Sequence, residues 1–262
     1  MGNGAAMELR QLGPNGPLVS PLSLGSTKFG RREGVKYPTS FELPSDRELD
    51  ALLTLAKDLG INLVDTAPAY GTSEARIGAL IGNDDHWRIA TKAGEEFIGG
   101  KSSFNFSAPA IRASVERSRR LLRRDVLDVV VLHLSDGDHD IMKDGAALAT
   151  LLEMRDQGVI NAVGASTKSV PAGMIAAACC DLIMIPLNQA DQSQRSVLEA
   201  AREAGKGILI KKPLDSGHQG NVGASLANLV RIHGVTSVIT GTISTSHLLE
   251  NCMAVNQALA SG

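Results

Sequence analysis

The chain has 262 residues, which suits one closed α/β barrel of about 250 residues as a single domain. Its 26 Lys and Arg side chains nearly balance 28 Asp and Glu, so its overall charge excludes a strong attraction to nucleic acid or to an anionic membrane, and we expect a small-molecule partner. Three cysteines, two of them adjacent at Cys179 and Cys180, fit neither a disulfide framework nor a CxxC metal spacing, so they favour a reducing, cytoplasmic location.

The first twenty residues divide into two parts. Residues 1–6 lack the apolar core of a signal peptide, and we expect them to be a disordered leader. Residues 7–20 alternate in polarity around a Pro-Asn-Gly turn, which predicts a small β-hairpin that plugs the bottom of a barrel. No apolar stretch approaches the roughly 20 residues that cross a bilayer, so we expect no membrane segment. Residues 7–262 are then a single domain.

Apolar runs rich in β-branched residues alternate with helix-period segments from residue 21 to the C-terminus. This alternation is typical of a parallel sheet. Helix signals separate the runs: Ser45 and Glu48 form a capping box before an apolar stripe that Gly60 ends, and Pro109 opens a later helix. A doubly wound sheet needs fewer units, whereas eight strands are the number that a (β/α)8 TIM barrel requires, so we predict that α/β fold. The strands are expected at 21–27, 61–65, 87–92, 126–133, 159–165, 182–188, 207–211 and 235–240.

Polar residues end several of these strands, and in barrel enzymes the catalytic groups lie at that end. Asp65 ends the second strand, Lys92 the third and His133 the fourth, while Tyr70 lies in the loop just after Asp65. We expect these four side chains to face one mouth of the barrel.

These residue types suit acid-base chemistry on an oxygen atom. A phenol has a pKa of about 10, so Tyr70 needs a nearby cation such as Lys92 to stabilise its anion. Asp65 can keep a buried Lys92 charged, and His133 can donate a hydrogen bond to a carbonyl oxygen. None of the four is an obvious nucleophile, so the pattern leaves the covalent step to a cofactor such as a nicotinamide.

The segments that carry these residues resemble the aldo-keto reductase family over nearly the whole chain. The matching segments are PLSLGSTKFG, GINLVDTAPAYGTSEARIG, RIATKAG, DVVVLH, GVINAVGAST and VTSVITGTISTSHLLEN. The resemblance implies NADP(H), possibly NAD(H), no metal, and hydride exchange with a small aldehyde, ketone or sugar. Tyr70 would be the general acid and base in a tetrad with Asp65, Lys92 and His133.

The resemblance also implies a cofactor site. It places Ser166, Thr167 and Gln189 near the nicotinamide carboxamide. It places near the adenosine end Gly241, Thr242, His247, Glu250 and Asn251.

Four positions depart from the family pattern. Thr167 stands where Asn is common, and Lys211 stands where many members stack an aromatic ring on the nicotinamide. Gly241 and His247 stand where a basic pair often grips the 2'-phosphate of NADP. The preference between NADP and NAD is therefore open, as is the oligomeric state.

Two long irregular stretches, 29–44 and 94–107, are expected to choose the substrate, because barrel enzymes vary these loops. The second holds Phe97, Phe104 and Phe106 among flexible glycines, which suits a closing lid with Phe29 as the opposing wall. These rings can equally anchor a long loop to the barrel rim.

Two other functions remain open from the residues alone. One is a non-catalytic, cofactor-sensing barrel. The other is a Schiff-base lyase that uses Lys92 or Lys211 as nucleophile. The sequence HLSDGDHD does not predict a calcium loop because Ile141 stands where that loop needs glycine. The arginine run at 117–124 fits a solvated helix face better than a nucleic-acid site.

Overall fold

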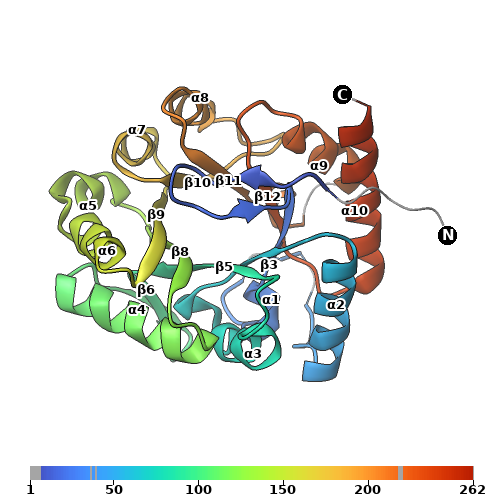
Figure 1. Cartoon of the computed structure of the whole chain (residues 1–262), viewed down its shortest axis with the longest axis horizontal. Coiled ribbons are helices and arrows are strands. Elements are labelled where there is room, and N and C mark those ends of the chain that lie inside the picture. Colours follow the sequence, from blue (N-terminus) through green and yellow to red (C-terminus); the bar gives the residue numbers. More distant parts are fainter. Residues whose placement is uncertain (1–6, 36, 39, 218–220, 262) are drawn as a thin grey trace.

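The computed structural model describes residues 7–35, 37–38, 40–217 and 221–261. The leader predicted at residues 1–6 lies outside them. Eight parallel strands close into a barrel and a ring of helices surrounds it (Figure 1), which confirms the (β/α)8 fold. In barrel order the strands are β3 (Leu22–Gly25), β4 (Leu63–Asp65), β5 (Arg88–Ala93), β8 (Leu127–His133), β9 (Ile160–Ser166), β10 (Leu182–Pro186), β11 (Gly207–Lys211) and β12 (Ser237–Thr240).

The barrel interior is filled by alternate residues of the strands, as the two-residue period of a strand requires. Leu63, Ala90 and Val131 belong to one buried apolar cluster inside the barrel. The residue two positions further along each strand is polar: Asp65 follows Leu63, Lys92 follows Ala90, and His133 follows Val131. The polar residues therefore form the top layer of the same inward-facing stacks.

The second helix after β3 confirms the capping signals in the sequence. Helix α2 (Asp46–Asp58) begins after Ser45, whose hydroxyl accepts from the Glu48 amide, and the Glu48 carboxylate accepts in return from the Ser45 amide. Its buried face consists of Leu49, Leu52, Leu53 and Ala56. The other helices are α1 (Thr27–Gly30), the 3-10 turn η1 (Pro68–Tyr70), α3 (Ser73–Ile81), α4 (Ala108–Leu122), α5 (Asp138–Asp144), α6 (Ala146–Asp156), α7 (Val170–Cys179), α8 (Arg195–Glu203), the 3-10 turn η2 (Asp215–Gly217), α9 (Val222–Val230) and α10 (Thr245–Ala260).

The predicted N-terminal hairpin is present. Strands β1 (Arg10–Gln11) and β2 (Leu18–Val19) pair antiparallel, and Leu12 and Val19 are fully buried in the cluster that fills the barrel. The Ser20 amide donates to Asn62 Oδ1 at 2.8 Å, just before β4 begins. The hairpin therefore closes the N-terminal end of the barrel.

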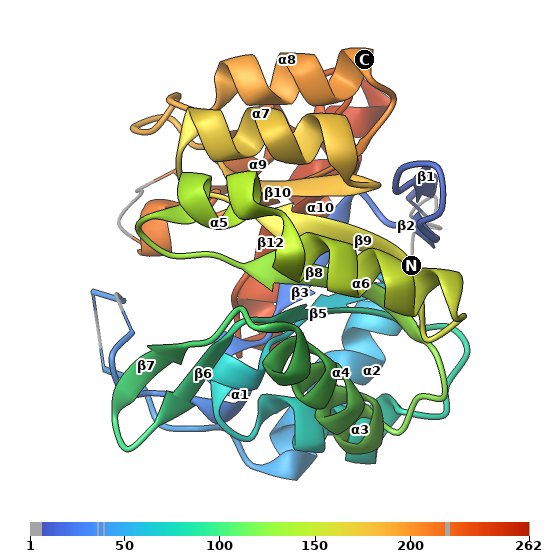
Figure 2. The ribbon, with the colours of Figure 1, turned by 90° about the vertical axis from the view of Figure 1, so that its left-hand side faces the viewer.

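A second hairpin replaces the irregular stretch expected at 94–107. Strands β6 (Glu95–Ile98) and β7 (Lys101–Phe104) pair antiparallel, and the turn between them is Gly99-Gly100, with φ of +59° and +80°. Such a turn needs two residues with positive φ, and Gly-Gly between two short runs is a hairpin signal that the sequence did contain. Figure 2 shows the two hairpins at opposite ends of the barrel.

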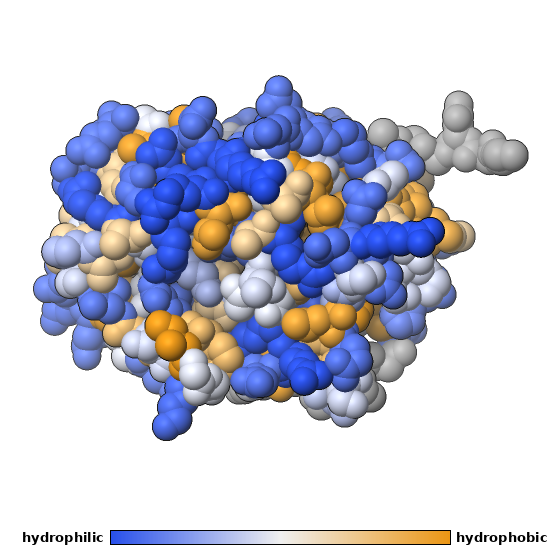
Figure 3. Space-filling model, turned by 90° about the horizontal axis from the view of Figure 1, so that it is seen from below, coloured by the Kyte–Doolittle hydropathy of each residue, from blue (hydrophilic) through white to orange (hydrophobic). Residues whose placement is uncertain are grey.

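The outside of the ring is largely polar. The face seen in Figure 3 carries mostly hydrophilic residues with scattered hydrophobic ones, as expected for helix faces turned to solvent. Within the described ranges, no helix combines the length and the apolar character needed to span a bilayer.

Candidate active site

The strand-end side chains meet in one cavity of about 480 Å³ at the C-terminal mouth. Asp65, Tyr70 and His133 line it together with Lys211 and Gly241, which come from the opposite side of the barrel. The structure thus brings Tyr70 of η1 together with residues at the ends of β4, β8 and β11 and just after β12.

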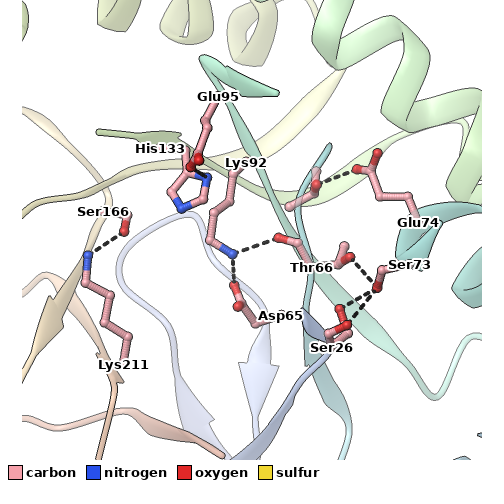
Figure 4. A network of polar contacts seen from close by, with 11 residues as sticks. Ser26, Asp65, Thr66, Ser73, Glu74, Lys92, Glu95, His133, Ser166 and Lys211 are labelled. Atoms are coloured by element: carbon pink, nitrogen blue, oxygen red, sulfur yellow. Dashed lines mark hydrogen bonds and ion pairs between the residues drawn. The ribbon is translucent and has the colours of Figure 1, made fainter. Parts of the chain in front are cut away.

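Lys92 lies beneath the cavity and is 2 % exposed. Its Nζ donates to Asp65 Oδ1 at 2.6 Å and to the Thr66 carbonyl at 2.7 Å (Figure 4). Burial by itself lowers the pKa of Lys92. The charges of Asp65 and Tyr70 raise the pKa by more than burial lowers it, so the net shift is upward. Lys92 is therefore an ammonium ion at neutral pH.

Tyr70 stands over this ammonium. The Lys92 Nζ lies 4.7 Å from the centre of the Tyr70 ring. Burial raises the pKa of the Tyr70 phenol, and Lys92 offsets part of the rise. The phenol is therefore protonated in the free protein and lies next to the cation that stabilises its anion.

The backbone around Tyr70 is held tightly. Gly71 has a φ of +63°, and a Cβ there would lie 2.1 Å from the Gly30 carbonyl oxygen. Only glycine fits this close approach between the loop after β4 and the end of α1. The tyrosine thus has a fixed anchor on the barrel rim.

His133 has a partner that sequence reasoning missed. Glu95, the first residue of β6, places Oε2 2.9 Å from His133 Nδ1. The His133 and Tyr70 rings stand nearly perpendicular, with centroids 6.1 Å apart. Burial lowers the pKa of His133, and Glu95 offsets part of that shift.

Lys211 fills the far side of the mouth. Its Nζ donates to Ser166 Oγ at 2.8 Å and to the Thr167 carbonyl at 2.9 Å. Among the described residues no carboxylate forms an ion pair with it. Burial and the nearby charges of Lys212, Lys92 and Lys168 lower the pKa of Lys211 to about 7.

Two features of this side of the mouth suit a nicotinamide carboxamide. The Thr167 Oγ1 is buried and has no hydrogen-bond partner among the described residues. The buried Ser166 Oγ accepts from Lys211 Nζ, and Lys211 lines the cavity. Both hydroxyls can pair with an amide, so these residues fit the group that the resemblance implied.

The other residues expected near a cofactor are more scattered. Gly241 lines the cavity, whereas Gln189 lines a separate cavity of about 590 Å³ with Asn188 and Gln192. Thr242 and Asn251 are buried, and His247 and Glu250 are exposed. None of these last four lines the cavity that contains Tyr70.

Of the four phenylalanines expected at the substrate, one lines the cavity. Phe104 is 41 % exposed and faces it. Phe29 is fully buried in the main core, so it does not form the opposing wall that we expected. Phe97 lies against the Arg31 guanidinium at 3.5 Å, and Phe106 packs on the core beneath Gly94.

The loop at 29–44 does contribute to the wall, through residues that sequence reasoning did not select. Arg31 and Tyr37 line the cavity, and the Nζ of neighbouring Lys28 lies 3.9 Å from the centre of the Tyr37 ring. The position of the loop was a usable signal, but which of its side chains turn inward was not visible in the sequence.

The closed barrel and the cluster of acid-base groups at its mouth together define the class of this protein. It is a (β/α)8-barrel protein whose candidate site lies at the C-terminal ends of the strands. The model of the aldo/keto reductase family matches residues 21–220 of this chain. The chain therefore belongs to the aldo/keto reductase family.

Individual relatives agree with this assignment. The chain is 31 % identical over 245 residues to pyridoxine 4-dehydrogenase of Escherichia coli, covering 83 % of this chain and 85 % of that protein. It is 34 % identical over 157 residues to D-arabinose 1-dehydrogenase of Saccharomyces cerevisiae, covering 56 % of this chain but only 43 % of the yeast protein. A crystal structure assigned to the aldo-keto reductases, that of PA4992 from Pseudomonas aeruginosa, is 42 % identical with a TM-score of 0.89 and covers 98 % of both chains.

Proposed function

We propose that this protein transfers a hydride between NADP(H) or NAD(H) and a small aldehyde, ketone or sugar, with Tyr70 exchanging the proton. The contact that carries the proposal is the buried Lys92–Asp65 pair directly beneath the Tyr70 ring. A buried, permanently charged ammonium stabilises a phenolate, which is the form that Tyr70 takes once it has given up its proton.

The bound nicotinamide would supply the hydride. Ser166 and Thr167 would hold its carboxamide, and Lys211 would have to release Ser166 or share it. Gly241 would let the dinucleotide approach the rim closely. The protein's own task is to orient the substrate oxygen between Tyr70 and His133 and to move the proton at the Tyr70 hydroxyl.

The names of the relatives suggest a range of substrates. Pyridoxine and D-arabinose both offer a primary alcohol or a sugar carbon that a dehydrogenase oxidises to the carbonyl level. A cavity of about 480 Å³ accommodates molecules of this size.

A direct test begins with a fluorescence titration of the protein with NADPH and with NADH. A panel of small aldehydes, sugars and alcohols is then assayed for turnover by the change in nicotinamide absorbance. We expect saturable binding of at least one cofactor and turnover of at least one substrate. Binding without turnover of any of them would instead support a cofactor-sensing barrel.

The Schiff-base alternative now falls on Lys211 rather than on Lys92. The Lys92 amine is held as an ammonium ion by Asp65, whereas the pKa of Lys211 is lowered to about 7, which leaves about half of it as the free amine at neutral pH. Borohydride trapping of an aldehyde on the protein, lost in Lys211→Met, would favour a lyase; no trapped adduct would exclude it.

A further inference from the structure

The cavity at the barrel mouth carries a surplus of positive charge. Asp65 and Glu95 are the carboxylates among its described lining residues. Each faces a basic group, because Asp65 accepts from the buried Lys92 and Glu95 Oε2 lies 2.9 Å from His133 Nδ1. The cations that line the same cavity are Lys28, Arg31, Lys168, Lys211 and Lys212. The mouth therefore suits anions and disfavours a further positive charge.

Lys211 contacts both residues that we propose to hold a nicotinamide carboxamide. Its Nζ donates to Ser166 Oγ at 2.8 Å and to the Thr167 carbonyl at 2.9 Å, and both acceptors are uncharged. In Figure 4, Lys211 and Ser166 lie together on one side of the mouth, apart from the Lys92–Asp65 pair. The carboxamide of a nicotinamide is attached directly to the ring. A ring bound through these two hydroxyls therefore lies next to the Lys211 amine.

The two redox forms of a nicotinamide cofactor differ in charge at the ring. The oxidised ring carries one positive charge, whereas the reduced ring has gained a hydride and carries none. The phosphates are the same in both forms, so their attraction to the cations of the mouth cancels when the two forms are compared. Only the oxidised ring is repelled by a charged Lys211.

We propose that Lys211 makes this protein bind the reduced cofactor more tightly than the oxidised cofactor, by repelling the positive nicotinamide ring. The inference rests on the proposed function, because it requires a nicotinamide in the mouth. Carbonyl reduction moves a hydride from the ring to the carbonyl carbon and a proton from Tyr70 to the oxygen, and it leaves the oxidised ring beside Lys211. The repulsion then favours release of the oxidised cofactor and reloading with the reduced one.

The preference should depend on pH because Lys211 titrates near neutrality. Burial and the neighbouring cations lower its pKa to about 7 in the free protein. Below the pKa the amine is charged and repels the oxidised ring, and above it the amine is neutral and the repulsion disappears. The phosphates of a bound cofactor raise this pKa equally in both complexes, so the change is expected between pH 6 and pH 9.

Several other charged groups face Lys211 and need to be separated from it. They are Lys212 directly after it, Lys92 on β5, Lys168 after β9, Asp65 on β4 and His133 on β8. Burial lowers the pKa of His133 below its ordinary value of 6.5, so this ring is mostly neutral over the range. Lys211 is therefore the group whose change of charge the titration reports.

The test measures affinity without turnover, by isothermal titration calorimetry of the reduced and oxidised forms of NADP and of NAD at pH 6 and pH 9. The measured quantity is the dissociation constant of the oxidised form divided by that of the reduced form. We expect this ratio to be about five- to tenfold larger at pH 6 than at pH 9, the effect of a like charge that shifts a pKa by about one unit. In Lys211→Met the ratio at pH 6 should fall to about the parent's value at pH 9.

Two further variants separate the charge of Lys211 from its contacts. Arginine stays charged over the whole range, so Lys211→Arg should keep a high ratio at both pH values. The matched control is Lys168→Met, because Lys168 lines the same cavity but is exposed and pairs with Asp136 at 3.3 Å. We expect this control to weaken both forms alike and to leave the ratio unchanged.

A parent ratio that does not change with pH would overturn the proposal, and this measurement needs no variant to fold. The same ratio at pH 6 in Lys211→Met and in the parent would also overturn it. In both cases the proposed function stands, because the cofactor still binds. Binding of neither redox form would instead remove the proposed function, and this inference with it.

Discussion

At the scale of single residues, the two tyrosines of the chain line the same cavity but have different neighbours. Tyr70 lies over the Lys92–Asp65 pair, whereas Tyr37 lies against Lys28 near the outer rim. Desolvation by burial raises the pKa of Tyr37 to about 12. Only Tyr70 therefore combines access to the cavity with a buried cation beneath its ring.

This difference gives a matched pair of variants. Tyr70→Phe should lower carbonyl reduction by about 10²–10⁴-fold, the usual contribution of a general acid, because the ring stays but the proton is lost. Cofactor affinity measured by fluorescence should stay nearly unchanged. Tyr37→Phe should keep most of the activity. A Tyr70→Phe variant that retained more than about a tenth of the parent rate would exclude Tyr70 as the acid.

The stability of the fold should depend on pH through Lys211. Below about pH 7 its amine is charged in both the folded and the unfolded chain, and the folded state bears the full cost of the buried ammonium. Between about 7 and the ordinary value of 10.5 the unfolded chain binds the proton and the folded chain does not, so stability rises with pH. We expect Lys211→Met to raise the Tm most at pH 6 and progressively less toward pH 10.

The control for this substitution is Lys101→Met, because Lys101 is exposed on the turn side of β7. The measured quantity is the difference in Tm between Lys211→Met and the parent. If this difference stayed the same from pH 6 to pH 10, the charge on Lys211 would not lower the stability of the folded protein.

At the scale of elements, the β6–β7 hairpin forms one wall of the cavity and also places a carboxylate against His133. It carries Glu95 to His133, Ser102 to Glu95, and Phe104 to the cavity rim. Phe106 follows the hairpin and packs against the core, with its ring stacked on Phe104 at 6.4 Å between centroids. The aromatic residues of one segment therefore divide into a cavity wall and an anchor.

We expect the two phenylalanines to respond differently to truncation. Phe104→Ala should change the ranking of kcat/KM across aldehydes of different bulk with little change in stability, because its ring faces the cavity. Phe106→Ala should lower the free energy of unfolding by about 2–4 kcal/mol, since its half-buried ring packs on the core, and should affect all substrates alike. An unchanged ranking in Phe104→Ala would remove the hairpin from the control of specificity.

At the scale of the whole molecule, the barrel is closed at one end by the β1–β2 hairpin and open to ligands at the other. Leu12 is fully buried in the interior cluster, whereas Leu18 on the same hairpin is 51 % exposed. The β1–β2 hairpin is therefore held to the barrel by the few side chains that point into its interior.

Leu12→Ala should lower the free energy of unfolding by about 2–5 kcal/mol, the range for large-to-small changes in a core. Leu18→Ala should change it by no more than about 0.5 kcal/mol. Chemical denaturation of both variants measures the difference. Equal effects would mean that the hairpin does not contribute its apolar side to the barrel.

The sequence by itself determined the barrel and much of its mouth. All eight strands, the capping box at Ser45 and the N-terminal hairpin follow from local patterns, because strand period, caps and turns depend on neighbours in the chain. Asp65, Lys92 and His133 could be placed at one mouth for the same reason: parallel strands of a barrel end on one face, and each residue is two positions beyond an inward apolar one.

Only the tertiary structure decided which side chains meet there. It brought Glu95 to His133, set Lys211 on Ser166 and the Thr167 carbonyl, and buried Phe29 in the core. Some of these contacts join segments that are far apart in the chain. Others depend on a hairpin whose strand register the sequence pattern did not predict. Their geometry depends on how the closed barrel positions its loops, and on the burial that shifts the pKa of each group, which no local pattern encodes.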